Sequence, residues 1–290
     1  MLGIVVVVYK SFNQTIRFIK NEIPKITVPS KTVIINNAST QEEGIKLAEA
    51  CGASLVLTEQ PITRDNNLFV ISSEDNLGYS KGNNLGARFL NDNFFIEHFL
   101  FSNDDIEITS NNVVVKLIER LDEAEKIGMI GPRVIGPDGA DQSPHFEVSF
   151  TRYFAWNAFP FLRGKFQLLQ KKNVYAYKEP VEGFCHWVSG CFFIVRTSTF
   201  LSAGMFDVHT FLYGEEKILA ERLLHLGHKA FFDPSVTVHH LSGGTTSKHL
   251  KSDWIKEEVF QNDCYYYAKY KFINPKWIRI LAVIRRLTIL

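Results

Sequence analysis

Two short acidic segments carry the residue types best suited to chemistry in this chain. The motif FLYGEE places the adjacent carboxylates Glu215 and Glu216 after an aromatic turn, and the motif FSNDD ends an apolar run with Asn103, Asp104 and Asp105. Hard divalent cations take oxygen ligands, so an acidic cluster at the end of a buried strand suits such a cation. A second carboxylate pair can supply a general base. Together the two segments predict transfer chemistry on a phosphate-bearing substrate.

Size and composition set the bounds within which that chemistry must be placed. The chain of 290 residues is 46% apolar and contains 24 phenylalanines, which is enough to build the core of one large α/β domain. A net charge of +1 argues against a broad nucleic-acid face, so we expect no nucleic-acid partner. The four cysteines form no CxxC pair, which indicates neither zinc nor a disulfide framework and predicts a cytoplasmic location.

The two ends of the chain differ in what they predict about membranes. The apolar run in MLGIVVVVYKSF is too short for a signal peptide and predicts a buried first strand. No stretch is long enough to span a bilayer. Residues 276–290 mix apolar residues with Lys276, Arg279, Arg285 and Arg286, a composition that suits a helix lying peripherally on the inner face of an anionic membrane. A helix packed on the domain, with its basic edge in water, fits equally well.

The first part of the chain alternates segments with strand and helix patterns. We expect strands at 4–9, 32–36, 68–73 and 97–104, and helices at 13–23, 42–52, 79–92 and 114–126. This order predicts an α/β fold with a Rossmann-like, mostly parallel central sheet flanked by helices. Ligands of such sheets bind beyond the carboxyl ends of the strands. Tyr9, Asn36, Asn37 and the Asn103–Asp105 cluster all follow predicted strands.

The second part is less regular. Residues 129–143 are rich in turn formers, and residues 144–180 hold many aromatic residues but few clear elements. Beyond them we expect a strand at 186–196, helices at 197–203 and 215–228, and one or two strands with a glycine-rich loop over 229–244. We therefore expect two lobes that share one sheet, followed by a C-terminal helical extension.

Six segments, taken in order, resemble a known family. The chain is similar to inverting family-2 glycosyltransferases of the GT-A fold, the group that includes rhamnosyltransferases. The resemblance runs from about residue 3 to residue 247 and rests on VVVVYKSFN, VIINNAS, NLGYSKGNN, FSNDDIEI, GPRVIGPDG, and the run from SGCFFIVR through FLYGEE to VTVHHLSGG. It implies a nucleotide-sugar-binding half at 1–110, an acceptor-binding and catalytic half at 111–247, and C-terminal helices at 248–290.

The resemblance also implies a reaction. A sugar would move from a nucleotide diphosphate donor, a UDP- or dTDP-sugar, to a hydroxyl of a saccharide or lipid-linked acceptor in surface polysaccharide synthesis. Mn²⁺ or Mg²⁺ would stabilise the leaving diphosphate.

Four residues carry the expected chemistry. The resemblance assigns Asp105 and His240 to the metal, with a loop at 242–244 positioned to close over the diphosphate. It makes Glu216 the catalytic base and Glu215 a partner that contacts the acceptor or orients the base. Simpler explanations stand beside these assignments. Acids after a strand cap helices, carboxylates favour a helix N-terminus, and a histidine at a strand end is often structural.

The nucleotide is expected to contact residues at the predicted strand ends and in the loop before the third helix. The resemblance assigns this role to Tyr9, Asn36, Asn37, Gly78, Lys81, Asn103 and Asp104. Asn36 stands where many relatives have Asp, and its carbonyl oxygen can still accept a hydrogen bond from a base. Turn geometry alone would also explain the glycine.

Two other functions fit parts of the pattern. A sugar nucleotidyltransferase would share the fold, but such enzymes usually begin with a glycine-rich loop, and VYKSFN contains no glycine. A catalytically inert nucleotide-sugar-binding protein is favoured by departures from the family pattern at Asn36, Asn103 and Ile218. The position of Ile218 often carries an acid in relatives.

Overall fold

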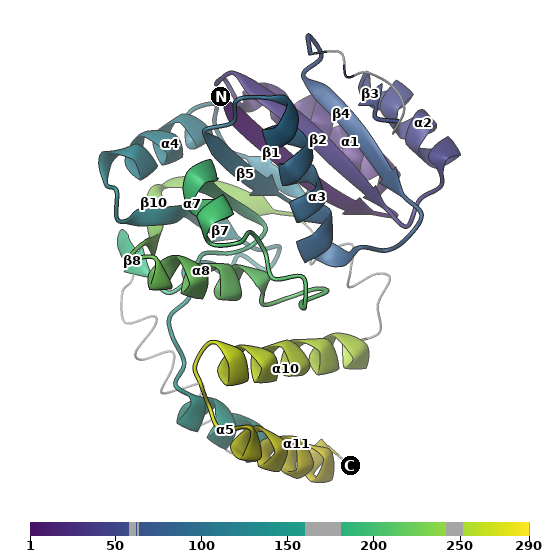
Figure 1. Ribbon diagram of the computed structural model, residues 1–290. Coiled ribbons are helices and arrows are strands. Elements are labelled where there is room, and N and C mark those ends of the chain that lie inside the picture. The colour runs from purple at the N-terminus through teal and green to yellow at the C-terminus, as the bar shows by residue number, and fades with distance from the viewer. Residues whose placement is uncertain (58–61, 63, 160–180, 242–251, 290) are drawn as a thin grey trace.

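In the computed structural model, one sheet of ten strands organises the chain (Figure 1). The structure describes residues 1–57, 62, 64–159, 181–241 and 252–289. The strands are β1 (Leu2–Tyr9), β2 (Ser30–Asn37), β3 (Ser54–Leu55), β4 (Leu68–Ser73), β5 (His98–Ser102), β6 (Ile106–Ile108), β7 (Ile127–Ile135), β8 (Gly183–Cys185), β9 (Phe192–Arg196) and β10 (Lys229–His240). The helices are α1 (Phe12–Asn21), η1 (Ile23–Lys25), α2 (Gln41–Cys51), α3 (Gly78–Asn93), α4 (Val113–Glu123), α5 (Phe150–Ala158), α7 (Thr197–Ser202), α8 (Glu215–His225), α10 (Ser252–Lys269) and α11 (Pro275–Ile289).

The sheet is parallel in its first part and mixed in its second. The strand order is β3-β4-β2-β1-β5-β9-β7-β10-β6, with β8 paired to β10. Strands β1 to β5 pair in parallel, and β10 pairs in parallel with β7. Strand β9 runs antiparallel between β5 and β7 and joins the two parts. The α/β fold with a mostly parallel sheet between helices is therefore confirmed.

Two apolar cores lie on opposite faces of the sheet. Because successive side chains of a strand point to opposite faces, Ile4 and Val6 of β1 join one core and Val5 joins the other. Helices α1, α2 and α4 cover the first face, and α3, α7 and α8 cover the second. Helix α3 packs closely because residue 86 is glycine, where an added Cβ would come within 2.6 Å of Val5.

A separate group of helices extends from the sheet domain. Helices α10 and α11 pack with α5 around small cores that include Phe260, Cys264 and Leu281. In Figure 1, α10 lies next to α8, and α5 and α11 lie side by side further from the sheet. None of the described helices is long and apolar enough to cross a bilayer. The expected division at residues 110 and 247 stays a prediction, since one sheet runs through both halves.

Several elements differ from the sequence-based prediction; the strand expected at 186–196, for example, is β9 and begins only at Phe192. Residues 129–143, read as turns, begin with β7, which contains Gly131 and Pro132. Proline fits because β9 pairs with β7 only at Met129 and Ile130, so Pro132 lies beyond that ladder. Residues 150–158, where no element was expected, form α5 with Ser149 as its N-cap. By contrast, the helix ending at Gly52 and the strand at 68–73 are confirmed.

Candidate active site

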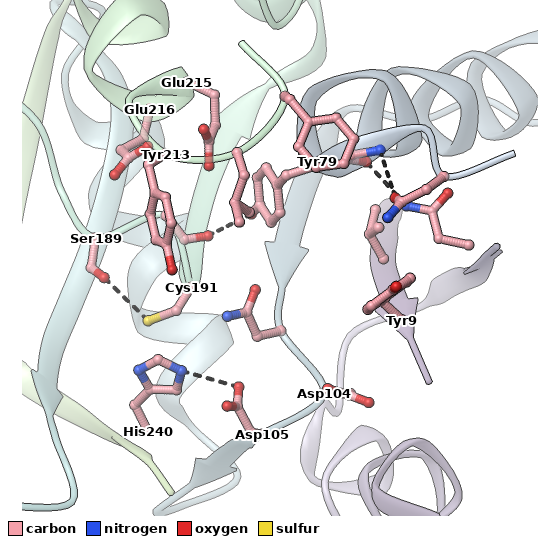
Figure 2. A pocket seen from close by; sticks show the side chains of 18 residues that line it. Tyr9, Tyr79, Asp104, Asp105, Ser189, Cys191, Tyr213, Glu215, Glu216 and His240 are labelled. Carbon is pink, nitrogen blue, oxygen red and sulfur yellow. Dashed lines mark hydrogen bonds and ion pairs between the residues drawn. The ribbon is translucent and has the colours of Figure 1, made fainter. Parts of the chain in front are cut away.

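A pocket of about 300 Å³ lies beyond the carboxyl ends of β1, β2 and β5 (Figure 2). Its walls come from both halves of the chain. Nine residues expected at a donor or catalytic site line it: Tyr9, Asn37, Gly78, Asn103, Asp104, Asp105, Glu215, Glu216 and His240. The location agrees with the rule that ligands of open α/β sheets bind beyond the carboxyl ends of strands. The fold therefore brings these residues, which are far apart in the sequence, into one cavity.

Two of the expected nucleotide-binding residues do not line this pocket. Asn36 points to the opposite face of β2 from Asn37, and its side chain bonds Ser39 Oγ at 3.0 Å and Ser72 Oγ at 3.3 Å. Lys81 is exposed on α3. Asn37 instead accepts from Leu77 N and donates to Gly78 O, so it fixes the start of α3.

Asp105 and His240 meet at one wall of the pocket. Asp105 follows β5, His240 ends β10, and Asp105 Oδ1 lies 3.1 Å from His240 Nε2. The other ring nitrogen, His240 Nδ1, lies 2.8 Å from Gln142 Oε1. With a hydrogen on Nδ1 donated to Gln142, Nε2 is the ring nitrogen that faces the carboxylate oxygen. His239 points away, with Nδ1 3.4 Å from Glu107.

This pair fits a divalent cation. Two electron-rich atoms that face each other at 3.1 Å need a proton or a cation between them, and both atoms are buried. A histidine oriented by a hydrogen bond from its second ring nitrogen is the usual arrangement of a metal ligand. No group of three His, Cys, Asp or Glu side chains converges on one point among the described residues. Asp105 and His240 would thus be the protein's share of a coordination sphere that a diphosphate could complete.

Asp104 points away from this pair toward α1 (Figure 2). Its carboxylate accepts hydrogen bonds from Ser11 Oγ at 2.6 Å, Thr15 Oγ1 at 2.8 Å and Gln14 Nε2 at 2.8 Å. Burial raises the pKa of Asp104, and these three hydrogen bonds oppose the rise. The side chain therefore anchors the end of β5 to α1, while the residue still lines the pocket.

Glu215 and Glu216 form the facing wall at the N-terminus of α8. The chain enters this helix through Tyr213 at φ 70° and Gly214 at φ 87°, two successive left-handed residues. That conformation is costly for tyrosine, so the surrounding contacts must hold it. One carboxylate oxygen of each glutamate is buried and makes no hydrogen bond with any described residue.

The environment of this pair favours the protonated forms. Burial raises the pKa of Glu215 well above its usual range, and the charge on Glu216 raises it further. Burial also raises the pKa of Glu216, against the effect of backbone hydrogen bonds at the helix start and of Lys217. Two adjacent carboxyl groups with raised pKa values at a pocket wall are typical of acid–base sites.

Contacts from α3 and α10 hold the loop before α8. Tyr79 N at the start of α3 donates to Phe211 O at 2.7 Å, and Tyr79 Oη donates to Gly190 O at 2.6 Å. From α10, Asn262 Nδ2 donates to Leu212 O at 2.8 Å and Tyr213 O at 3.0 Å. The wall that carries the glutamates therefore depends on α3 and α10.

Asp207 is the polar centre of that support. Its carboxylate accepts from Tyr270 Oη at 2.5 Å and Tyr265 Oη at 2.7 Å of α10 and its C-terminal end, and pairs with Arg222 of α8 at 3.0 Å and Lys269 at 3.1 Å. These hydrogen bonds hold the pKa of Asp207 far below its usual range, although partial burial opposes them. Asp207 thus ties the loop and α8 to α10.

The sequence analysis did not single out several residues in or beside the pocket. Gln142, which orients His240, lies in a turn-rich segment with no distinguishing pattern. The ring of Tyr213 lies in the pocket (Figure 2), and its only sequence signal is its place before the two glutamates. Burial raises the pKa of Cys191 to about 12, so its thiol is neutral. Ile218 is buried against Tyr266, which explains the absence of an acid there. The loop expected at 242–244 lies outside the described residues.

One curated protein resembles the chain in sequence. No family model matches the sequence. A low-salt glycan biosynthesis hexosyltransferase of Haloferax volcanii, Agl10, is 27% identical over 217 residues. The match covers 74% of this chain and 59% of that protein, so the chain spans about three fifths of the relative's length.

Solved structures share the architecture. A mannosyltransferase from Pyrobaculum calidifontis, in complex with GDP-Man and Mn²⁺, aligns with a TM-score of 0.56 at 14% sequence identity. The alignment covers 99% of this chain and 69% of the mannosyltransferase chain. GalNAc-T7, in complex with UDP, GalNAc and Mn²⁺, aligns with a TM-score of 0.58 at 15% sequence identity. The alignment covers 92% of this chain and 50% of the GalNAc-T7 chain. The chain has a GT-A fold. TarS of S. aureus aligns less closely, with a TM-score of 0.51 at 12% sequence identity. The alignment covers 93% of this chain and 44% of the TarS chain. The GT-A resemblance seen in the sequence is thus confirmed, while its inverting and rhamnosyltransferase-like details stay predictions.

Proposed function

We propose that this GT-A protein is a metal-dependent inverting glycosyltransferase. It would transfer a sugar from a nucleotide diphosphate donor, a UDP- or dTDP-sugar, to a hydroxyl of a saccharide or lipid-linked acceptor in surface polysaccharide synthesis. One observation carries the proposal: a buried carboxylate pair with raised pKa values, Glu215 and Glu216, shares a pocket with a strand-end pair that suits a cation, Asp105 and His240. The curated hexosyltransferase and the GT-A neighbours support it.

The chemistry follows from the two walls. The acceptor hydroxyl gives its proton to the Glu216 carboxylate, its oxygen bonds the anomeric carbon, and the bond from that carbon to the diphosphate breaks with its electron pair on the leaving group. A divalent cation, when bound, neutralises the charge that develops on the diphosphate. The proposed mechanism needs Glu216 to be ionised, and a proton held on the neighbouring Glu215 would relieve the repulsion between the two carboxylates.

The donor end of the pocket is built from β1, β2 and the start of α3. Tyr9 and Asn37 line it, and Asn103 and Asp104 border the metal side. We expect Tyr9 to pack on the base, and Asn37 and Gly78 to face the ribose or diphosphate. Asn36 and Lys81 lie outside the pocket lining, because Asn36 is hydrogen-bonded to two serines and Lys81 is exposed on α3.

Donor binding and turnover test the proposal separately. Uridine, thymidine and guanosine diphosphate sugars are titrated into the protein by calorimetry, each with and without Mn²⁺. We expect cation-dependent binding of one base class, followed by release of the diphosphate and formation of a product with inverted anomeric configuration by NMR. Binding without any transfer to offered acceptors, unchanged in Glu216→Gln, would support the inert binding protein. Release of pyrophosphate from a sugar phosphate and a nucleoside triphosphate would support the nucleotidyltransferase.

The pH profile provides a second test. Glu216 must be ionised to accept a proton, and burial raises its pKa above the ordinary value of 4.5. Turnover should therefore fall as the pH drops, with a midpoint above that value. A profile that stays flat down to the acid unfolding of the protein would contradict the assignment of Glu216 as base.

A further inference from the structure

Helix α11 divides its circumference into three sectors. One sector packs inward, where Leu281 is fully buried and Ile278 and Ala282 join the core with α5 and α10. Arg285 belongs to this sector, since its guanidinium stacks over Phe260 at 3.9 Å and pairs with Glu257 at 3.0 Å. The helix is therefore held firmly on the protein by one side, and its charge on that side is already compensated.

The second sector is apolar and faces outward. Trp277, Ile280, Val283 and Leu287 are 56%, 42%, 58% and 70% exposed. Their spacing of three and four residues places them within about one third of the helix circumference. Phe272, in the turn before α11, is 81% exposed. Single exposed apolar residues are ordinary on a protein surface, but an aligned row of four beside an aromatic turn marks an interaction surface.

The third sector, next to the apolar row, carries Arg279 and Arg286, and Lys276 lies in the first turn of the helix in line with the row itself. All three side chains are exposed, and none of them forms an ion pair with a residue in the described part of the chain. Helix α11 contains no acidic residue. Three uncompensated cations beside an apolar row is the pattern of a helix that lies in the headgroup region of an anionic bilayer.

We infer that the α11 surface, formed by the apolar row and its basic neighbours, binds an anionic lipid bilayer. The apolar side chains would enter the boundary between headgroups and acyl chains, with Trp277 at the interface, where its ring is apolar and its N–H can remain hydrated. Arg279 and Arg286 would reach lipid phosphates. In Figure 1, α11 lies on the part of the molecule furthest from the sheet, which leaves this surface open to a flat partner.

The charge of this surface favours an anionic lipid bilayer over a second copy of the chain as its partner. A second copy of the chain would place the cations of two α11 helices near one another, which is unfavourable. The chain has a net charge of only +1, so the basic character here is local and not a general property of the surface. The inference does not depend on the proposed catalytic activity, because it concerns a different surface.

Vesicle sedimentation tests this inference directly. The full chain is mixed with phosphatidylcholine vesicles that either contain or lack phosphatidylglycerol. We expect binding to the anionic vesicles only, falling with added salt. Because each cation near an anionic surface contributes about 1 kcal/mol, or about fivefold, the triple substitution Lys276→Gln, Arg279→Gln and Arg286→Gln should weaken binding on the order of 100-fold. The double substitution Ile280→Ser and Leu287→Ser should weaken it by about tenfold or more.

Matched controls separate this surface from general charge and apolar exposure. Lys20, Lys116 and Lys126 are exposed elsewhere, and their triple change to Gln removes the same charge. Phe95, in the segment before β5, is 79% exposed, and Phe95→Ser removes apolar area far from α11 in sequence. Both controls should bind like the parent protein. Thermal unfolding confirms that each variant is folded.

Three outcomes would overturn the inference. Equal loss of binding in the charge-matched control would show unspecific electrostatic attraction. No sedimentation with either vesicle would exclude a lipid partner of this class. A concentration-dependent dimer in light scattering, abolished by Ile280→Ser with Leu287→Ser, would assign the row to a second copy of the chain. The donor-binding experiment is read independently, so failure of either proposal leaves the other standing.

Discussion

The two walls of the pocket differ in how their charged groups are supported. At the strand ends, His240 is oriented by Gln142 and meets Asp105 across 3.1 Å, on the backbone of a hydrogen-bonded sheet. At the start of α8, Glu215 and Glu216 each bury an oxygen that no described residue hydrogen-bonds, after two left-handed residues. The first wall suits a bound cation, and burial at the second wall disfavours the charged forms of its two carboxyl groups.

This difference separates binding from chemistry. A preformed pair on a rigid sheet suits a group that must be placed accurately, such as a cation with a diphosphate. A desolvated carboxylate on a helix start suits a base, because removing water raises its affinity for a proton. Substitutions on the two walls should therefore have different signatures, which the following experiments exploit.

The largest effect is expected from Glu216→Gln. Removing the base should lower the turnover number by about a hundred- to ten-thousand-fold, while donor and cation binding remain within a few-fold of the parent. Glu42→Gln on the exposed face of α2 is the matched control, since its carboxylate contacts only Lys46 among the described residues. Turnover by diphosphate release and binding by calorimetry are compared. Loss of donor binding in Glu216→Gln would show that Glu216 also contributes to donor binding, which would contradict the separation of binding and chemistry between the two walls.

Asp207→Asn should be the most destabilising of these changes. The substitution removes the charge that two tyrosines, a lysine and an arginine share, and should lower the free energy of unfolding by about 2 kcal/mol after allowance for solvent screening at Lys269. Because the pKa of Asp207 is lowered in the folded protein, its stabilisation is present at neutral pH and is lost as the pH falls through the acid range. Urea unfolding at neutral and acid pH checks this. An unchanged difference at acid pH would contradict it.

Gln142→Leu tests the support of the first wall alone. Without an acceptor for Nδ1, the imidazole loses its fixed orientation, and the affinity for Mn²⁺ in the presence of nucleoside diphosphate should fall about 10- to 100-fold. Asp105→Asn should lower it further. Gln41→Leu, at the exposed start of α2, is the control. Mn²⁺ binding is followed by electron paramagnetic resonance. An equal loss in both glutamine variants would remove Gln142 from the metal site.

The smallest effect is expected from Glu215→Gln on stability, and it has the opposite sign. A carboxyl with a raised pKa stabilises the fold only while protonated, so its cost appears as the pH rises above the ordinary value of 4.5. Replacing it with a neutral amide should raise the free energy of unfolding by roughly 1–2 kcal/mol at neutral pH and by less at pH 4.5. Thermal unfolding at both pH values decides. Destabilisation at neutral pH would show that the Glu215 carboxylate makes favourable interactions in solution, which would contradict this prediction.

Local signals explain what the sequence could predict. The helix over Gln41–Cys51 has both a capping box at Thr40 and a left-handed Gly52, so both its start and its end could be predicted from the sequence. Strand β7 was missed because Gly131 and Pro132 break a local pattern, although the end of the β9 ladder makes room for them. Pro132 is still paired with Asp233 of β10, at the last position before that ladder loses register, and no local pattern in the sequence records where these ladders end.

The same limit applies to the site. Acidic pairs such as Glu215 with Glu216 stand out because they are adjacent in sequence and follow a recognisable turn. The Gln142 side chain makes one hydrogen bond to a residue 98 positions away, and the Asn262 side chain makes two to residues about 50 positions away. No nearby sequence pattern indicates either partner. Asn36 and Asn37 show the converse, since adjacency in a strand sends the two side chains to opposite faces.

The attachment of the loop before α8 to α10 has a consequence for local opening of the protein. Leu212 and Tyr213 are held by Asn262, and Asp207 by Tyr265 and Tyr270, so the loop cannot detach without breaking contacts to α10. In native-state hydrogen exchange, amides of the loop and of α10 should share one opening free energy, distinct from that of the sheet. A partner that holds the α10–α11 unit still would therefore also slow exchange beside the catalytic glutamates.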